Sequence, residues 1–279
     1  MIHHEITDKS LAPPDPAYFD EIGFFKHIEI EINTACDLAC FGCDRFSDVT
    51  RAPNMTVEQV ALFVKESLDL NWEWERIRFL GGEPTLHPKF EEMCLLLVEY
   101  RNRFPKVFLQ VLTNGVGKSK DFDLKRFCGQ HRIYLHAEQK AVGVQPAWFT
   151  NTRIVPLDRD PNCGELPPCS IFGIRGCGIG LTRHGFFLDG AGASIARVAG
   201  YDIGVMSLKD VTFRRMLEQA KPLCCRCGHW NATDATFENG KIVTKLISET
   251  GMITGKFWTE TLAAYNKEKP KLKIYGTDK

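Results

Sequence analysis

The chain has 279 residues, 44% of them hydrophobic, and its 35 basic side chains balance 35 acidic ones. This length can bury a large core, either as one α/β domain or as a domain with a small appendage. The zero net charge gives no reason to expect a nucleic-acid partner, and no apolar run approaches the roughly 20 residues that cross a bilayer, so we expect no membrane partner. The polar N-terminus lacks the pattern of a secretory signal, which predicts a cytoplasmic protein.

Eleven cysteines in such a chain indicate metal or redox chemistry rather than disulfides, because the cytosol keeps thiols reduced. Nine of them form three groups, at 36–43, 163–177 and 224–227. The other two, Cys94 and Cys128, each lie in an apolar helical pattern, and we expect both to be small core residues.

Residues 28–157 alternate between short β-type runs and longer helical patterns, which predicts βα units and a parallel sheet. The first strand, HIEIEIN at 27–33, alternates with period two and leads directly into the first cysteine group. A helix is expected at 56–68, where Thr56 and Gln59 fit a capping box. Its apolar face is predicted to be Val57, Val60, Ala61, Val64 and Leu68. Later strands are expected at 76–82, 106–115, 132–139 and 152–158, and later helices at 90–104 and 121–128.

The alternation of strand and helix patterns ends at about residue 158, and the composition changes. Residues 157–170 are rich in proline and cysteine and indicate a linker. A hairpin is predicted at 178–190, turning near His184 and Gly185, and a helix at 208–220. A second hairpin is predicted at 236–246, with Asn239 and Gly240 at its turn, and a last helix at 256–268.

The first cysteine group places Cys36, Cys40 and Cys43 on one tight loop after the first strand. Three thiolates can hold three corners of a cubic iron–sulfur cluster, which leaves the fourth iron open for a cofactor or substrate. Two alternatives are a structural zinc site, which usually has four ligands in paired spacings, and a ferredoxin-like cluster, which needs a fourth cysteine nearby. The spacing favours the open iron.

The CxxxCxxC loop resembles the signature of the radical S-adenosylmethionine (radical SAM) enzymes, and GGEP at 81–84, after the second strand, resembles their second motif. The resemblance implies a partial (β/α)6 TIM-like barrel. It also implies that the three cysteines bind a [4Fe-4S] cluster whose open iron is chelated by S-adenosylmethionine. An external electron donor such as flavodoxin or ferredoxin would reduce the cluster.

The same resemblance implies roles for further residues. Gly81, Gly82 and Glu83 would help to hold the methionine amino group, and Phe41 would lie near the adenine. Reductive cleavage of S-adenosylmethionine would give a 5'-deoxyadenosyl radical that removes hydrogen from a substrate.

Polar residues at later strand ends are the natural remaining contacts to cofactor or substrate. Asn114 and Glu138 are the favoured candidates. For Thr113, His136 and Arg153 a solvated strand end is the favoured interpretation.

The second cysteine region contains a CxxC at Cys224 and Cys227, a common half-site for iron–sulfur or zinc. With Cys169 and Gly185 it resembles the twitch or SPASM-like extension of some radical SAM enzymes, which binds an auxiliary cluster. The likeness implies a second [4Fe-4S] cluster, which we assign to Cys169, Cys177, Cys224 and Cys227, and Cys163 and Cys225 are then spare thiols. A structural zinc on the same four cysteines is the alternative.

The sequence departs from the twitch pattern at one position. A cysteine is expected five residues after Gly185, but Gly190 stands there. Cys177 supplies the missing ligand in our interpretation, with a carboxylate from Asp189 or an open site as alternatives. We interpret residues 189–194, DGAGAS, as a tight loop beside the cluster rather than as a phosphate-binding loop, because the GxGxxG spacing is absent.

These patterns predict four regions: an N-terminal extension at 1–27, a radical SAM core at 28–160, a cysteine-rich auxiliary region at 161–235, and a C-terminal hairpin and helix at 236–279. The predicted function is radical oxidation or rearrangement of a small polar metabolite, with the auxiliary cluster assisting electron transfer or substrate binding. One alternative is a maturase of a ribosomally made peptide, although residues 1–27 are too short for a winged-helix leader-binding domain. A second alternative is a non-catalytic iron–sulfur or zinc protein.

Overall fold

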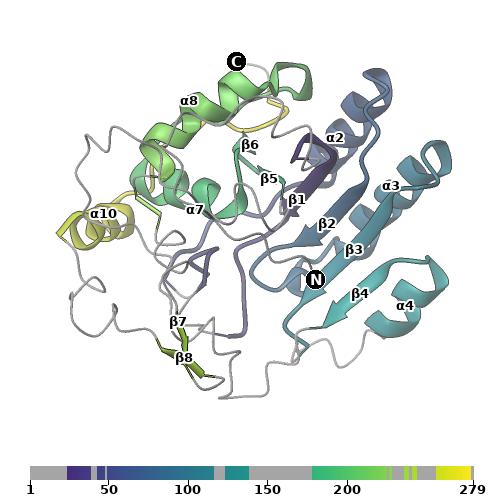
Figure 1. Ribbon diagram of the computed structural model, residues 1–279, viewed down its shortest axis with the longest axis horizontal. Helices are drawn as coiled ribbons and strands as arrows, with labels where there is room; N and C mark the ends of the chain where they lie inside the picture. The colour runs from purple at the N-terminus through teal and green to yellow at the C-terminus, as the bar shows by residue number, and fades with distance from the viewer. Residues whose placement is uncertain are drawn as a thin grey trace.

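The computed structural model describes residues 24–38, 43–47, 49–115, 123–137, 178–224, 226–227, 236–238, 241–243 and 256–277. A six-stranded sheet in the order β4-β3-β2-β1-β5-β6 forms the centre (Figure 1). The strands are β1 His27–Glu31, β2 Arg76–Leu80, β3 Phe108–Thr113, β4 Tyr134–Ala137, β5 Ile179–Thr182 and β6 Gly185–Phe187. All neighbours from β4 to β5 pair in parallel, and β6 is antiparallel to β5. The predicted mixed α/β fold with a parallel sheet is confirmed.

Six α-helices lie among the described residues, and all but one of them were predicted from the sequence. They are α2 Val57–Asp69, α3 Phe90–Arg103, α4 Leu124–Gln130, α7 Gly190–Ala199, α8 Phe213–Cys224 and α10 Lys256–Lys267, with short 3-10 helices at Phe24–Lys26, Pro84–Leu86 and Leu208–Asp210. The helix that was not predicted is α7. A separate antiparallel hairpin joins β7 Thr236–Glu238 to β8 Lys241–Val243, as predicted. The strand expected at 152–158 and the linker at 157–170 lie outside the described residues. None of the described helices is long and apolar enough to cross a bilayer.

Helix α2 begins with the predicted capping box. The backbone N–H of Gln59 donates to Thr56 Oγ1 over 3.3 Å, and the Thr56 N–H donates to Gln59 Oε1 over 2.9 Å. The predicted apolar face is partly wrong, because Leu68 is 41% exposed and Phe63 is fully buried instead. Phe63 lies against Trp74, with 5.7 Å between the ring centroids. The buried face of α2 is therefore centred nearer to Phe63 than the apolar pattern predicted, and Leu68 lies outside it.

One face of the sheet is a continuous apolar surface. The residues that pair with Ile30 across the sheet are apolar on every strand: Phe79, Val111, Leu135, Leu181 and Phe186. All of these except Leu135 belong to the main core cluster, with Ile28, Ile32 and buried side chains of α2 and α3, and Leu135 packs against that cluster. The apolar positions of HIEIEIN thus point into the core, as the alternation predicts.

The opposite face carries a polar row one residue away. Glu29 pairs with Arg78, Arg78 with Gln110, and Gln110 with Tyr134. Tyr134 is exposed, whereas Glu29 and Gln110 are only 5% and 7% exposed. A strand that alternates in sequence usually turns its polar side to water. Here the polar side is an interior surface.

Strand β5, which the sequence places in the auxiliary region, pairs with β1 in the main sheet. The predicted hairpin is confirmed, since β6 folds back on β5 through Thr182 and Gly185. A domain boundary at residue 160 would therefore separate two hydrogen-bonded strands of one sheet.

The tight loop expected at 189–194 is wrong, because these residues begin helix α7. Asp189 is the N-cap, and its carboxylate accepts a 2.6 Å hydrogen bond from the Gly192 N–H. Small residues then carry the helix, which is buried from Gly190 to Val198. Aspartate is a preferred N-cap residue, so Asp189 was a signal for the start of a helix. The two glycines that follow it favoured the interpretation as a loop.

Cys94 in α3 and Cys128 in α4 are both 1% exposed and belong to the core, as predicted. Burial raises the pKa of the Cys128 thiol to about 11 and raises that of Cys94 well above its ordinary value. Both side chains therefore behave as small apolar groups at neutral pH.

Candidate cluster and cofactor site

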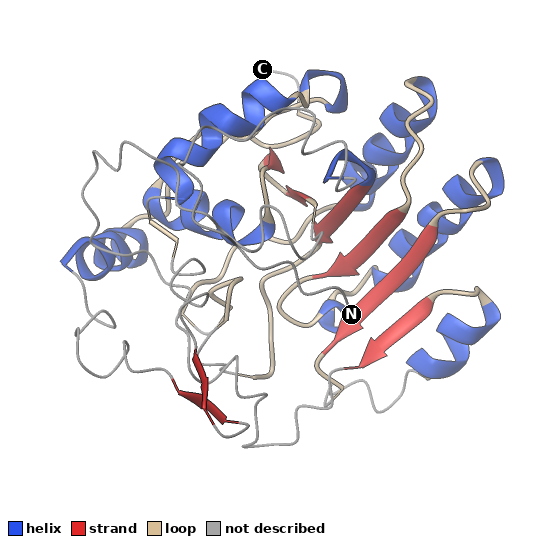
Figure 2. Ribbon diagram, in the orientation of Figure 1, coloured by secondary structure: helices blue, strands red, loops and turns tan. Residues whose placement is uncertain are grey.

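The carboxyl ends of the parallel strands all lie at one edge of the sheet, as the arrowheads in Figure 2 show. Strand β1 is the point at which the order reverses, with β2 on one side and the later strand β5 on the other. In open α/β sheets, ligands bind outside the carboxyl ends of the strands at such a reversal. The first cysteine loop begins at this position, a few residues after Glu31.

Backbone hydrogen bonds join the segment before Cys36 to the GGEP segment. The Gly82 N–H donates to Asn33 O over 3.0 Å, and the Glu83 N–H donates to Ala35 O over 2.7 Å. A Cβ atom on Gly81 would lie 2.2 Å from Asn33 Oδ1, and one on Gly82 would lie 2.3 Å from Ala35 O. Both glycines are thus required for this close backbone approach.

Glu83 joins the end of β2 to the end of β3. Its side chain is fully buried and accepts hydrogen bonds from Thr113 Oγ1 at 2.9 and 3.0 Å and from the Asn114 N–H at 2.9 Å. It also accepts from the N–H and hydroxyl of Thr85, at 3.1 and 2.6 Å. Donors on two different segments therefore hold this carboxylate in one orientation.

Asn114 extends the connection from β3 to the cysteine loop. Its side-chain Nδ2 donates to Asp37 Oδ1 over 2.7 Å and lies 3.9 Å from Cys36 Sγ. Three of the residues predicted to form the site, Cys36, Glu83 and Asn114, are brought together in this way.

The two described cysteines of the loop each accept a hydrogen bond from a backbone N–H. The Leu38 N–H donates to Cys36 Sγ over 3.5 Å, and the Ser47 N–H donates to Cys43 Sγ over 3.4 Å. Such donors stabilise thiolate sulfur and tune iron–sulfur clusters, so the two residues fit the predicted cluster. Within the described part of the chain no three Cys, His, Asp or Glu side chains are grouped to hold a metal ion. Cys40 and Phe41 lie outside it.

Buried ion pairs surround the glutamates of β1, the strand that leads into the cysteine loop. Glu29 accepts from Arg45 Nη2 and from Arg78 Nη1, each over 2.5 Å, and Glu31 accepts from Arg197 Nη1 over 2.6 Å. Glu29, Glu31, Arg45 and Arg197 are all at most 6% exposed. The sequence analysis missed these residues, although the glutamates of HIEIEIN were visible as the second half of its alternation.

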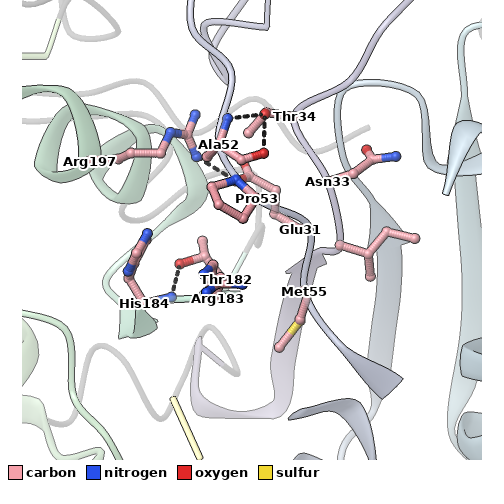
Figure 3. A pocket seen from close by; sticks show the side chains of 11 residues that line it. Glu31, Asn33, Thr34, Ala52, Pro53, Met55, Thr182, Arg183, His184 and Arg197 are labelled. Carbon is pink, nitrogen blue, oxygen red and sulfur yellow. Dashed lines mark hydrogen bonds and ion pairs between the residues drawn. The ribbon is translucent and has the colours of Figure 1, made fainter. Parts of the chain in front are cut away.

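A small pocket lies at the carboxyl ends of β1 and β5 (Figure 3). Its wall includes Glu31, Thr34, His184 and Arg197, and its cavity volume of about 10 Å³ is room for one water molecule. Glu31 Oε2 and Arg197 Nε are buried without a hydrogen-bond partner among the described residues.

The other predicted residues are only partly described. Thr113 contacts Glu83, and His136 lies on β4 at the same edge of the sheet. Cys224 ends α8, and the Cys227 N–H donates to Cys224 O over 3.2 Å, so the CxxC forms a turn. Glu138, Arg153, Cys169 and Cys177 lie outside the described residues, as do Cys163 and Cys225.

Asp189, an alternative ligand for the auxiliary cluster, caps α7 and is 8% exposed. Burial raises the pKa of its carboxyl to about 6, against the opposing effects of the Gly192 N–H and of Arg45. Its hydrogen bond to Gly192 gives this carboxylate a structural role in the fold.

Comparison with known proteins bears directly on this site. The sequence model of the radical SAM superfamily matches residues 30–139, which include the cysteine loop, GGEP and Asn114. This part of the chain is thus similar to the radical SAM superfamily. The match implies a SAM-binding [4Fe-4S] cluster and points to an enzyme.

A curated protein similar to part of the chain is the mitochondrial GTP 3',8-cyclase of Arabidopsis thaliana. The two are 25% identical over 134 residues, which are 45% of this chain and 32% of the relative. The chain thus spans about a third of that protein.

Two solved structures are similar to parts of the chain. A crystal structure of BtrN in complex with AdoMet and 2-DOIA matches with a TM-score of 0.48 and 16% identity, over 78% of this chain and 97% of BtrN. The Streptococcus suis protein SuiB, bound to its precursor peptide SuiA, matches with a TM-score of 0.29 and 18% identity, over 37% of this chain and 23% of SuiB.

Proposed function

We propose that this chain is a radical SAM enzyme that removes hydrogen from a small polar metabolite, leading to oxidation or rearrangement. When bound and reduced, the cluster and its S-adenosylmethionine supply a 5'-deoxyadenosyl radical, which is the species that abstracts hydrogen. The observation that carries the proposal is the convergence of Cys36, Glu83 and Asn114 at the ends of three adjacent strands. Motifs that lie far apart in sequence thus share one edge of the sheet.

The residues of the chain take the following roles in this proposal. Cys36, Cys40 and Cys43 hold the cluster, and the N–H groups of Leu38 and Ser47 stabilise two of the thiolates. Gly81, Gly82 and Glu83 would help to hold the methionine amino group, and Phe41 would bind near the adenine. Asn114 and Glu138 would bind the cofactor or the substrate. Because Asn114 also binds Asp37, it orients the loop at the same time.

A second [4Fe-4S] cluster on Cys169, Cys177, Cys224 and Cys227 is part of the proposal. Its support is the turn that brings Cys224 and Cys227 together at the end of α8, where both are half-buried. This cluster would accept the second electron of an oxidation or bind the substrate. We place it in a C-terminal extension of a partial (β/α)6 barrel.

A small polar substrate is supported by the Arabidopsis relative, whose name gives it a nucleotide to act on. We propose a cytoplasmic enzyme that receives its electron from flavodoxin or ferredoxin. A ribosomally made peptide is the alternative substrate class.

The test of catalysis is cleavage of S-adenosylmethionine. Anaerobically reconstituted and dithionite-reduced wild-type protein should form 5'-deoxyadenosine, measured by chromatography, and Cys40→Ala should not. Cys94→Ala, which changes a cysteine buried in α3, is the matched control and should retain the activity. Equal product from Cys40→Ala and wild type would refute the assignment of the loop.

The test of the second cluster is iron content. Cys227→Ala should lower the iron per chain by about one cubane and leave the electron paramagnetic resonance (EPR) signal of the first cluster present. Cys225→Ala is the neighbouring control and should lose no iron. Equal iron in both variants and wild type would show that Cys227 holds no cluster.

The test of substrate class uses deuterium. Deuterated polyols, aminocyclitols, nucleosides and peptides should be offered separately, and 5'-deoxyadenosine should gain deuterium only from a small polar metabolite. Transfer from a peptide alone would select the alternative substrate class.

A further inference from the structure

Arg45 stands two residues after Cys43, and its guanidinium is buried between β1 and the start of α7. It is 6% exposed, and its Nη2 donates to Glu29 Oε2 over 2.5 Å. Burial alone would lower the pKa of this guanidinium, but the charges of Asp44, Glu29 and Glu31 outweigh burial and raise it. The side chain is therefore a fixed cation behind the cysteine loop.

The backbone of Arg45 is held as firmly as its side chain. Its carbonyl oxygen accepts a 2.7 Å hydrogen bond from Arg197 Nη2. Arg197 lies on α7, and its Nη1 is paired with Glu31 on β1. One residue at the end of the loop is thus attached to both a strand and a helix, at its main chain and at its side chain.

Gly190 provides the space that this arrangement needs. A Cβ atom at Gly190 would lie 1.3 Å from Arg45 Nη1 and 2.2 Å from its Cζ. Any other residue at this position must displace the guanidinium. Gly190 is also the position at which the twitch pattern expects a cysteine, so the guanidinium fills the space that a ligand side chain would occupy.

The guanidinium has one nitrogen left to donate. Arg45 Nη1, the atom nearest to the Gly190 Cβ position, has no acceptor among the described residues. A buried donor without an acceptor is costly, and a charged one more so. The described contacts that hold the guanidinium are therefore those of Nη2 with Glu29 and of Nε with Asp44.

We propose that Arg45 is a positioning residue that fixes the Cys43 end of the cluster-binding loop against β1 and α7, and that residue 190 is glycine to accommodate its guanidinium. The inference rests on the proposed function, since it takes the loop to hold a cluster. Arg45 is not part of the CxxxCxxC motif, so the motif alone does not predict that this residue affects how firmly the cluster is retained.

The test is a double-mutant cycle of Arg45→Ala and Gly190→Ala. Two properties are measured for each variant: the unfolding temperature of the iron-free protein, and the rate at which a chelator removes iron from the reconstituted protein. Each single variant should lower the unfolding temperature and speed iron release by roughly tenfold, because groups in contact are strongly coupled. In the Arg45→Ala background, Gly190→Ala should do no further harm and should raise the unfolding temperature, because alanine favours helix over glycine. Additive losses would overturn the proposal.

Two further variants separate positioning from general destabilisation. Ile30→Ala weakens the apolar core, to which the Ile30 side chain belongs, whereas the ion pairs are made by its neighbours Glu29 and Glu31 on the other face of β1. It should release iron more slowly than Gly190→Ala, even though it lowers the unfolding temperature of the iron-free protein. Arg45→Lys keeps the charge but not the planar fork, so it should restore part of the iron retention that Arg45→Ala loses. Equal iron release from Ile30→Ala and Gly190→Ala would overturn the positioning role.

Failure of the proposed function gives a different result. If Cys40→Ala retains as much iron as wild type, the loop holds no cluster, and the role of Arg45 in cluster retention falls with it. The coupling in unfolding temperature would persist in that case, because it depends only on packing.

Discussion

The two faces of the central sheet are both buried at β1, but one is apolar and the other is polar and charged. Across the row of Ile30 every strand contributes an apolar side chain, whereas across the row of Glu29 the strands contribute Arg78 and Gln110. Both Ile30 and Glu29 are buried, at 0% and 5% exposure. Period-two alternation in HIEIEIN therefore separates two interiors, and only one of them is a hydrophobic core.

The difference matters because substitutions on the two faces destabilise the protein by different mechanisms. Truncating an apolar side chain loses transfer free energy and leaves a cavity. Removing one member of a buried ion pair leaves a charge with no partner, which costs more than the pair itself contributes. The polar face also reaches the cysteine loop, through Arg45, so damage there should extend to the site.

The largest effect is expected from Glu29→Ala, which leaves Arg45 and Arg78 without their shared carboxylate. The free energy of unfolding should fall by about 4 kcal/mol. Urea denaturation of the iron-free protein measures it. Glu29→Gln keeps the shape and one acceptor and should lose clearly less. A loss below about 1 kcal/mol for Glu29→Ala would mean that the charged row is not an interior.

The next effect is expected from Ile30→Ala on the apolar face. Loss of a fully buried isoleucine should lower the free energy of unfolding by about 3.5 kcal/mol. Leu68→Ala, at an exposed position of α2, is the control and should change it by less than about 0.5 kcal/mol. Similar losses from both variants would contradict the described core.

A pH-dependent effect is expected from Asp189→Asn at the start of α7. Since burial raises the pKa of Asp189 to about 6, from an ordinary 3.8, its folded form binds a proton that its unfolded form releases. This contribution to stability is full below pH 3.8 and is lost as the pH rises through 6. Asparagine keeps the cap but cannot titrate. The free energy of unfolding of Asp189→Asn minus that of wild type should therefore increase by about 1.4 kcal/mol between about pH 5 and about pH 7.5. A difference that does not change with pH would show that this carboxyl titrates normally.

The smallest effect is expected from Gln110→Ala in the polar row. Arg78 Nε loses a 2.9 Å hydrogen bond to Gln110 Oε1 but keeps its ion pair with Glu29. The free energy of unfolding should fall by about 1 kcal/mol. In the Glu29→Ala background the same substitution should cost more, because Gln110 is then the remaining described acceptor of Arg78 on this row. Equal costs in both backgrounds would show that the row does not act as a network.

Local signals in the sequence were sufficient for most individual elements. The alternation of 27–33, the capping box at Thr56 and the turn residues Asn239 and Gly240 act within a few positions, and each leads to the expected element. The CxxxCxxC and GGEP motifs likewise predicted which strand ends meet. The structure adds Asn114 as the residue that connects them.

Non-local features could not be read in this way. Pairing of β5 with β1 joins residues about 150 positions apart, and periodicity does not specify which strands become neighbours. The same pattern HIEIEIN would arise whether its glutamates faced water or buried arginines. The partners are Arg45 in a loop and Arg197 on a helix whose first residues were predicted as a loop, and neither carried a periodic signal of its own.

The most direct measurement is ⁵⁷Fe Mössbauer spectroscopy of anaerobically reconstituted protein that carries Cys224→Ala and Cys227→Ala, so that iron in the first loop dominates. Adding S-adenosylmethionine should change the signal of one iron of the cluster and leave the others unaltered, because three cysteines leave that iron available to the cofactor. A spectrum that S-adenosylmethionine does not alter, or zinc bound in place of iron, would contradict a cluster with an open site at Cys36, Cys40 and Cys43.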